Sequence, residues 1–266
     1  MIRLIRRFDI FMIHFRSKGF HVSWVLAIIA AGAALFYVER RFQTTVENIP
    51  INPNHTITKP ILPKNTNQPD SAPAIASSLL IPVPFTPQAP TANWDTLHNE
   101  ACEEASAIMA HAYFEGMKDS TLDPSFVEEE IAKLTEWETN AFGYYLDINT
   151  KETARLLEEF YNLKTKILTD YSADDIKQEL LQNHIVLWPA NGKLLGNPNF
   201  RSPGPPYHML VIKGYNSLGF ITNDPGTRKG LNYPYSFSTL YKANGDFDHE
   251  AHEVDLSKKM VISVWK

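Results

Sequence analysis

An almost wholly apolar run over residues 20–38 limits the fold of this chain more than any other feature. Its 19 residues are just enough for a helix to cross a bilayer. Five basic residues precede the run, whereas only Arg40 and Arg41 follow it closely. Because basic flanks stay cytoplasmic, the pattern predicts a short basic cytoplasmic segment (1–19), a transmembrane signal anchor (20–38) and export of the remaining chain.

A cleavable signal peptide is the alternative interpretation of the same run. The small residues at 31–34 would suit a signal peptidase. The apolar residues nevertheless continue through Val38 and then meet charge, which is more typical of an anchor. We therefore expect the segment to be retained, with the protein at the cell membrane as a single-pass chain.

Residues 39–80 are predicted to be a flexible spacer. Six prolines lie between residues 44 and 80 among Asn, Thr and Ser, with few large apolar side chains. Such a composition cannot bury enough surface to fold and favours an extended chain. Apolar alternation begins at Ile81, so we predict one folded domain over 81–266, long enough for a substantial core.

The charge balance of the exported part excludes some partners. Residues 1–43 hold seven of the 25 basic groups and two of the 30 acidic groups, so the remainder carries a formal net charge of −10. Nucleic acids and anionic lipid surfaces bind basic proteins. We therefore expect no nucleic-acid partner, and the only expected membrane contact is the N-terminal helix.

Hydrophobic periodicity predicts an α+β domain, with a helical lobe before an antiparallel sheet. Helical spacing is expected over 102–116, 126–137, 151–162 and, capped by Ser172, over the residues to 180. Short Val- and Ile-rich runs bounded by Gly, Pro and Asn predict strands at 184–189, 207–215, 218–223 and 259–265. A hairpin turn is expected at 216–219.

Cys102 is the only cysteine, which forbids an internal disulfide, and it stands at the start of the first predicted helix. A helix N-terminus favours the thiolate, so this placement suggests a nucleophile. The alternative is a buried thiol that only packs. Glu100, Glu103 and Glu104 oppose ionisation. We expect helical geometry to point the last two away from the sulfur, so that a thiolate–imidazolium pair survives.

A cysteine nucleophile needs a base and an orienting group. Of the nine histidines, His208 is the strongest candidate, because it opens a predicted strand after the irregular loop 191–206. His98 is expected to cap or lie at the surface, and His111 stands about 13 Å along the helix from the thiol. The hairpin partner brings Asp224 towards His208, although Asn-Asp-Pro-Gly is also ordinary turn chemistry.

These motifs together resemble the cysteine peptidase family thirty-nine-like domains. The segments that carry the resemblance are 83–90, 93–95, 101–106, 207–215 and 221–226, and the similarity spans nearly all of 81–266. The resemblance implies a papain-like fold related to bacteriocin leader-processing peptidases. It also implies Cys102 as nucleophile, His208 as general base and acid, Asp224 as orienter, and Gln88 as a donor in the oxyanion hole with the Cys102 backbone N–H.

Two functions stay open from the sequence. The first is a membrane-anchored, outward-facing cysteine peptidase that hydrolyses peptide or peptidoglycan amide bonds through an acyl-thioenzyme. The second is a catalytically silent papain-like domain that binds a peptide in its cleft. Leader processing does not carry over, because the chain has one membrane helix and no Gly-rich phosphate loop.

No cofactor is predicted, and the partner is a peptide or protein substrate. The acidic segment 246–255, with His249 and His252, has no closed metal-site spacing and is expected to be a solvated loop. Loop 191–206 is expected to set specificity. The sequence predicts no oligomeric state.

Overall fold

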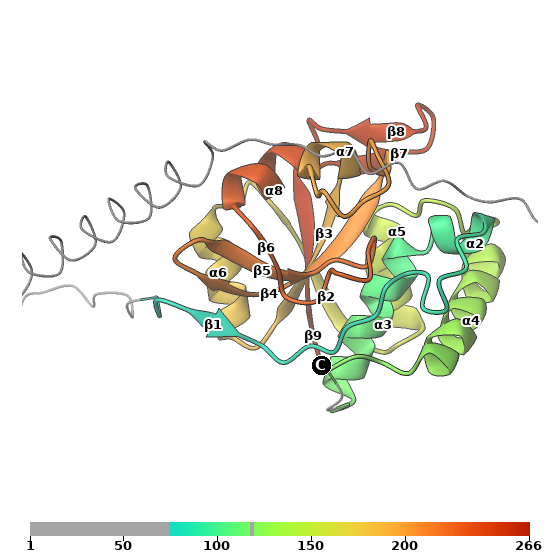
Figure 1. Ribbon diagram of the computed structural model, residues 1–266, viewed down its shortest axis with the longest axis horizontal. Helices are drawn as coiled ribbons and strands as arrows, with labels where there is room; N and C mark the ends of the chain where they lie inside the picture. The colour runs from blue at the N-terminus through green and yellow to red at the C-terminus, as the bar shows by residue number, and fades with distance from the viewer. Residues whose placement is uncertain (1–74, 118–119) are drawn as a thin grey trace, which may run out of the picture. The chain divides into compact units, whose positions relative to one another are not determined.

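The apolar runs in the second half of the chain form an antiparallel sheet at the centre of the fold (Figure 1). The protein is described by a computed structural model, which covers residues 75–117 and 120–266. The predicted segments 1–19 and 20–38 and most of the spacer lie outside these residues. Within the described part, no helix has the length and hydropathy to cross a membrane. All described residues belong to one compact unit.

The main sheet has seven strands. Six follow the order β2-β9-β3-β4-β5-β6, and β1 pairs with β4. Their bounds are β1 Leu79–Leu80, β2 Lys164–Thr169, β3 Ile185–Ala190, β4 His208–Asn216, β5 Gly219–Asn223, β6 Tyr233–Tyr235 and β9 Met260–Trp265. A separate hairpin joins β7 (Asp246–Asp248) to β8 (Glu253–Asp255).

Strands β3, β4 and β9 form the buried middle of the sheet. Every residue of β3 is buried, which explains its continuous apolar sequence. The β4–β5 hairpin contains the turn predicted at 216–219, and its register shifts between Ile212 and Gly214. A Cβ at Gly214 would lie 2.4 Å from the Leu79 carbonyl oxygen. The glycine therefore allows β1 to approach β4 closely.

The predicted helices are all present, with ends set by recognisable caps. They are α3 (Cys102–Phe114), α4 (Pro124–Phe142), α5 (Thr150–Glu159) and α6 (Ala173–Leu181). Asp123 caps α4, whose first residue is Pro124, and Gly143 ends it in a left-handed conformation. Asn149 and Ser172 form capping boxes that start α5 and α6. Three short helices were not predicted: α2 (Thr96–Asn99), α7 (Gly192–Leu195) and α8 (Phe237–Ala243).

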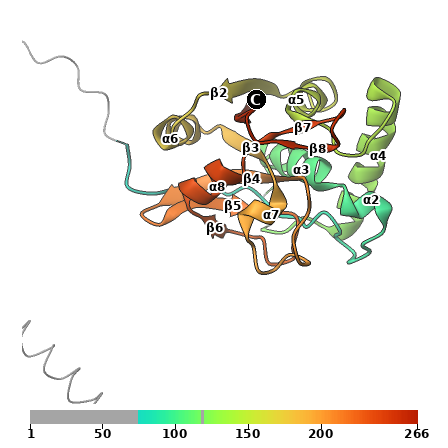
Figure 2. The ribbon, with the colours of Figure 1, turned by 90° about the horizontal axis from the view of Figure 1, so that it is seen from above.

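The expected division into a helical lobe and a sheet lobe is confirmed for the first helices. Helices α2 to α5 gather at one end of the molecule in both views, and α6 lies at the other end (Figures 1 and 2). Helix α3 contacts α4, α5 and β4, so it connects the lobe to the sheet. The protein is thus a mixed helix and antiparallel-sheet fold.

The predicted order of helices first and strands afterwards is wrong at β2. This strand lies between α5 and α6 and pairs with β9 along its whole length. It is an edge strand with exposed Lys164 and half-exposed apolar residues, so its sequence lacks the continuous apolar run of the buried strands. Edge position therefore explains why the pattern did not reveal it.

Candidate active site

Cys102 is the first residue of α3, and its thiol is engaged by the next side chain. The residue is buried, and its Sγ donates a hydrogen bond to Glu103 Oε2 at 2.9 Å. Burial raises the pKa of the Cys102 thiol well above its ordinary value, and the Glu103 carboxylate raises it further. The thiol is therefore protonated in this arrangement. Glu103 turns back onto the sulfur, so the expectation that it points away, and that the thiolate survives, is not met.

A buried acid cluster of Glu103, Glu104 and Glu138 lies behind the thiol. All three side chains are buried, and the carboxyl oxygens of Glu104 and Glu138 have no hydrogen-bond donor among the described residues. Burial raises the pKa of Glu104 to about 7 and that of Glu138 to about 12, and their mutual repulsion contributes to the second shift. The two carboxyls therefore share at least one proton at neutral pH.

His208 and Asp224 form a buried pair, as the sequence predicted. His208 is the first residue of β4, where it lies opposite Ala190 of β3, and Asp224 follows the last residue of β5. The His208 Nε2 lies 2.8 Å from Asp224 Oδ1. A Cβ at Gly226 would lie 2.9 Å from His208 Cε1, so this glycine allows the turn to pass close to the ring.

Asp224 accepts four hydrogen bonds. The His208 ring and the Gly226 backbone N–H (3.0 Å) contact Oδ1, while Tyr235 Oη (2.7 Å) and Asn197 Nδ2 (3.1 Å) donate to Oδ2. Burial opposes ionisation, but His208 and these donors hold the pKa of Asp224 below its ordinary value. The Gly226 bond shows that Asp224 closes a turn as well as contacting His208.

Sequence reasoning missed Asn197 and Tyr235. Asn197 lies within loop 191–206, where only a role in specificity was expected, and Tyr235 lies in the short strand β6. Neither residue has a spacing that relates it to Asp224. Their contact depends on the folding of two loops around one carboxylate, which a sequence pattern does not encode.

The thiol and the imidazole come from neighbouring elements, but no hydrogen bond joins them among the described residues. Ser106, one turn after Cys102, donates to the Met209 carbonyl oxygen at 3.3 Å, so α3 rests on β4 beside His208. The sulfur instead bonds to Glu103. The structure therefore brings His208 and Asp224 together and leaves Cys102 paired with an acid.

Gln88 lies between the two halves of the site, with its amide already engaged. Its backbone N–H donates to the Pro225 carbonyl oxygen at 2.9 Å, beside Asp224. Its side-chain Nε2 donates to the carbonyl oxygens of His98 and Asn99, both at 2.9 Å, on the approach to Cys102. An oxyanion role would require one of these two bonds to be released, since the amide has only two hydrogens.

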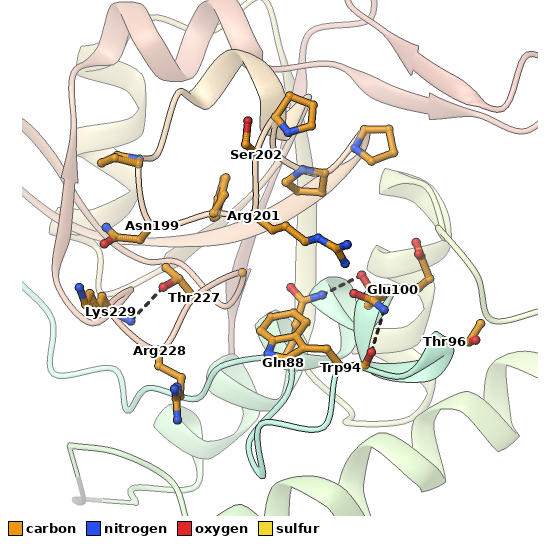
Figure 3. A pocket seen from close by; sticks show the side chains of 18 residues that line it. Gln88, Trp94, Thr96, Glu100, Asn199, Arg201, Ser202, Thr227, Arg228 and Lys229 are labelled. Carbon is orange, nitrogen blue, oxygen red and sulfur yellow. Dashed lines mark hydrogen bonds between the residues drawn. The ribbon is translucent and has the colours of Figure 1, made fainter. Parts of the chain in front are cut away.

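A cleft of about 1030 Å³ lies beside these residues (Figure 3). Its walls include Gln88, Trp94 and Glu100 on one side, and residues 198–206 and 226–229 on the other. The second half of the predicted specificity loop thus lines it. Cys102 and His208 do not line this cleft and are only 3% and 1% exposed, so the sulfur is closed off in this arrangement.

His98 and His111 have structural partners. His98 bonds to Asp95 Oδ1 and Glu128 Oε2, each at 2.8 Å; burial opposes its protonation, but these carboxylates raise its pKa. His111 stacks on Tyr161 with ring centroids 4.1 Å apart, and burial lowers its pKa. The expectation of a surface or capping role for His98 is wrong, because the residue is buried and the side chain that caps α2 is that of Asp95.

The acidic segment 246–255 serves local structure. Asp246 Oδ1 accepts hydrogen bonds from the Thr150 backbone N–H (2.8 Å) and hydroxyl (2.6 Å), and His249 Nε2 lies 2.9 Å from Glu152 Oε2. Among residues 75–117 and 120–266, no cluster of three acidic, histidine or cysteine side chains has metal-binding geometry.

Comparison with known proteins gives one family match. The model of the "Peptidase_C39 like family" matches residues 80–248. A solved structure described as a C39-like peptidase from Bacillus anthracis aligns with 72% of this chain and 98% of its own length, at 15% identity and a TM-score of 0.46. Among curated proteins, none matches. Because the family model covers more than half of the chain, this protein belongs to the peptidase C39-like family.

Proposed function

We propose that this protein is a cysteine peptidase with a papain-like arrangement, which hydrolyses peptide or peptidoglycan amide bonds. The observation that carries this proposal is the buried His208–Asp224 pair, because His208 begins β4, the strand that contacts the helix starting at Cys102. Membership of the C39-like family supports a cysteine peptidase domain and a peptide or protein substrate. Cys102 is the proposed nucleophile, His208 the base and acid, and Asp224 the residue that orients the imidazole.

The hydrogen bond between His208 and Asp224 supports different tasks for the two ring nitrogens. Because Nε2 bonds to Asp224, Nδ1 is the nitrogen available to the thiol. In the proposed reaction Nδ1 takes the Cys102 proton, and the sulfur attacks the substrate carbonyl carbon. The imidazolium then protonates the leaving amine, and the C–N bond breaks to give an acyl-thioenzyme. Water, deprotonated by Nδ1, hydrolyses the thioester and restores the thiol.

Two bonds of the resting arrangement must change before this reaction. The thiol must leave Glu103, and Gln88 must release a carbonyl oxygen to donate to the oxyanion with the Cys102 backbone N–H. Catalytic hydrogen bonds are often long or misaligned without substrate. We propose that substrate in the cleft drives both changes.

The second candidate function is a catalytically silent domain that binds a peptide. The specific observation in its favour is the buried, protonated thiol held by Glu103. The two functions differ in whether the sulfur reacts under the control of His208.

An electrophilic cysteine-peptidase probe separates the two functions. The full chain, Cys102→Ala and His208→Ala are incubated with the probe, and covalent labelling is followed by mass spectrometry. We expect labelling of the parent, none of Cys102→Ala, and a strong decrease in His208→Ala. Labelling that does not depend on His208, or no labelling of the parent, would favour the silent peptide-binding domain. Circular dichroism of each variant checks that it is folded.

We further propose that residues 20–38 anchor the protein in the cell membrane with the domain outside the cytoplasm. This rests on the apolar run and on the basic residues before it. Protease added to intact spheroplasts should remove the domain, and an alkaline carbonate wash should leave the chain in the membrane. Protection of the domain in intact spheroplasts would contradict the orientation, and its release by carbonate would contradict the anchor.

A further inference from the structure

Three cationic residues line the cleft beside the proposed catalytic pair. Arg201 comes from the specificity loop, while Arg228 and Lys229 come from the turn that follows Asp224. All three are exposed. They stand out because the chain beyond residue 43 has a formal net charge of −10.

None of the three cations is neutralised by a carboxylate within the described part of the chain. Basic residues elsewhere do form ion pairs, for example Lys133 with Glu129 and Lys177 with Asp174. The cleft cations do not take part in such pairs. The positive charge of this wall is therefore available to a bound molecule.

The backbone that carries Arg228 and Lys229 is fixed on Asp224. The Asp224 N–H donates to the Gly230 carbonyl oxygen at 3.1 Å, and the Gly230 N–H donates to the Thr227 carbonyl oxygen at 3.1 Å. A Cβ at Gly230 would lie 1.7 Å from the Asp224 carbonyl oxygen, so only glycine permits this closure. The backbone of Arg228 and Lys229 is thus fixed relative to Asp224, which contacts His208.

The loop that carries Arg201 is tied to the same carboxylate. Asn197 donates to Asp224 Oδ2 at 3.1 Å, and the Gly204 N–H donates to the Arg201 carbonyl oxygen at 2.8 Å. Figure 3 shows the Arg201 side chain extending into the cleft towards Gln88 and Glu100. The cationic wall is therefore built around the catalytic pair, with Glu100 on the facing wall.

We propose that this cleft recognises a carboxylate on the substrate peptide, close to the bond that is cleaved, through Arg201, Arg228 and Lys229. The proposal rests on the proposed function, because it assigns the substrate class of the same site. Guanidinium groups bind carboxylates in a bidentate geometry, and an ammonium adds a point charge. Glu100 repels negative charge on the other wall, which favours one direction of the bound peptide.

The carboxylate could belong to an acidic side chain or to a free C-terminus, so the probes separate these sources. Three equally labelled alanine-based peptides are used: one with several glutamates and an amidated C-terminus, one with glutamines in their place, and the glutamine peptide with a free C-terminus. Binding to full-chain Cys102→Ala is measured by fluorescence anisotropy, so no cleavage is needed. We expect at least one carboxylate peptide to bind about tenfold tighter than the amidated glutamine peptide, with a preference that weakens as salt is added.

A charge-matched control assigns the preference to the cleft. Arg228→Glu with Lys229→Glu should abolish it, whereas Lys164→Glu with Lys242→Glu, which are exposed and do not line the cleft, should leave it intact. Equal binding of all three peptides, or equal loss in both double variants, would overturn the proposal. Circular dichroism confirms that each variant is folded.

Failure of this proposal is distinguishable from failure of the proposed function. Covalent labelling of Cys102 by the electrophilic probe reports the reaction, while peptide binding to Cys102→Ala reports the cationic wall. A protein that labels at Cys102 but shows no carboxylate preference keeps the proposed function and loses the substrate class. A protein with the preference and no labelling keeps the cleft as a binding site only.

Discussion

The two halves of the candidate site bury carboxyl groups in opposite ways. Asp224 accepts four hydrogen bonds, and with His208 beside it the carboxylate keeps its charge. Glu104 and Glu138 are equally buried, yet no donor reaches their oxygens among the described residues. Burial opposes ionisation at all three carboxyl groups, and only at Asp224 do the charge of His208 and the surrounding donors outweigh it. One half of the site holds a charged carboxylate against His208, and the other half holds protonated acid close to Cys102.

Removal of Asp224 should have the largest effect, because this carboxylate is the shared acceptor of four hydrogen bonds. Asp224→Ala leaves His208, Tyr235 and Asn197 without their shared acceptor. We expect a loss of about 3–5 kcal/mol in the free energy of unfolding, measured by urea denaturation, together with loss of probe labelling at Cys102. Asp224→Asn keeps the volume and one acceptor and should retain most of the stability. Normal labelling in a folded Asp224→Ala protein would exclude this pair from activation of the thiol.

Glu104→Gln should show that the acid cluster costs stability at neutral pH. The folded-state pKa of Glu104 is raised, so its favourable contribution is present below pH 4.5 and is lost as pH rises through about 7. We therefore expect Glu104→Gln to stabilise the protein by about 1–3 kcal/mol at pH 8 and by little at pH 5. Urea denaturation at both pH values measures this.

The control for the acid cluster is Glu136→Gln on α4. This residue is exposed, so its substitution removes the same charge from solvent instead of from the core. It should change stability by less than about 0.5 kcal/mol at either pH. A pH dependence shared by both variants would show that net charge, and not burial of Glu104, is responsible.

Glu103→Gln should test whether the Glu103 carboxyl group controls the pKa of the Cys102 thiol. The substitution keeps an oxygen that can accept the thiol hydrogen bond but removes the carboxyl group whose negative charge, once it ionises, raises the pKa of Cys102. We expect the pKa of Cys102 to fall. The midpoint of the alkylation rate against pH measures this, and it is less sensitive to burial than the rate itself. Glu129→Gln, exposed on α4, is the control. An unchanged midpoint would mean that burial alone sets the thiol pKa.

Tyr235→Phe should weaken the hydrogen bonding around Asp224 without removing it. The variant removes one of the two donors to Asp224 Oδ2 and leaves Asn197 in place. We expect a loss of about 1 kcal/mol in the free energy of unfolding. We also expect a rise in the pH below which probe labelling is lost. Tyr233→Phe is the matched control, because its hydroxyl has no hydrogen bond among the described residues. If Tyr235 had only a structural role, stability would fall and the pH below which labelling is lost would not change.

The sequence predicted the parts of this comparison that depend on local pattern. The helix that starts at Cys102 and the hairpin that brings Asp224 to His208 follow from apolar periodicity and turn chemistry. The conformation of the Glu103 side chain does not, since helical spacing alone places it away from the sulfur. The contacts of Tyr235 with Asp224 and of Gln88 with the chain before Cys102 join distant loops, and only the folded chain fixes them.

Lys213 extends the comparison to a buried cation and should have the smallest effect. Its Nζ donates to the Val83 carbonyl oxygen at 2.9 Å, and burial lowers its pKa from 10.5 to about 8. The unfolded chain therefore binds more protons than the folded one between these values, so stability should rise with pH from about 8 to 10.5. Lys213→Met should remove this rise. At pH 7 the loss of the Nζ hydrogen bond and of its packing opposes the relief from burying a charge, so the net change there should be small; Asn223 Nδ2 still donates to the Val83 carbonyl oxygen. Urea denaturation across this pH range measures the slope, with exposed Lys242→Met as the control. If stability still rose with pH in Lys213→Met, another group would be responsible for the titration. The comparison of buried charged groups would then not include Lys213.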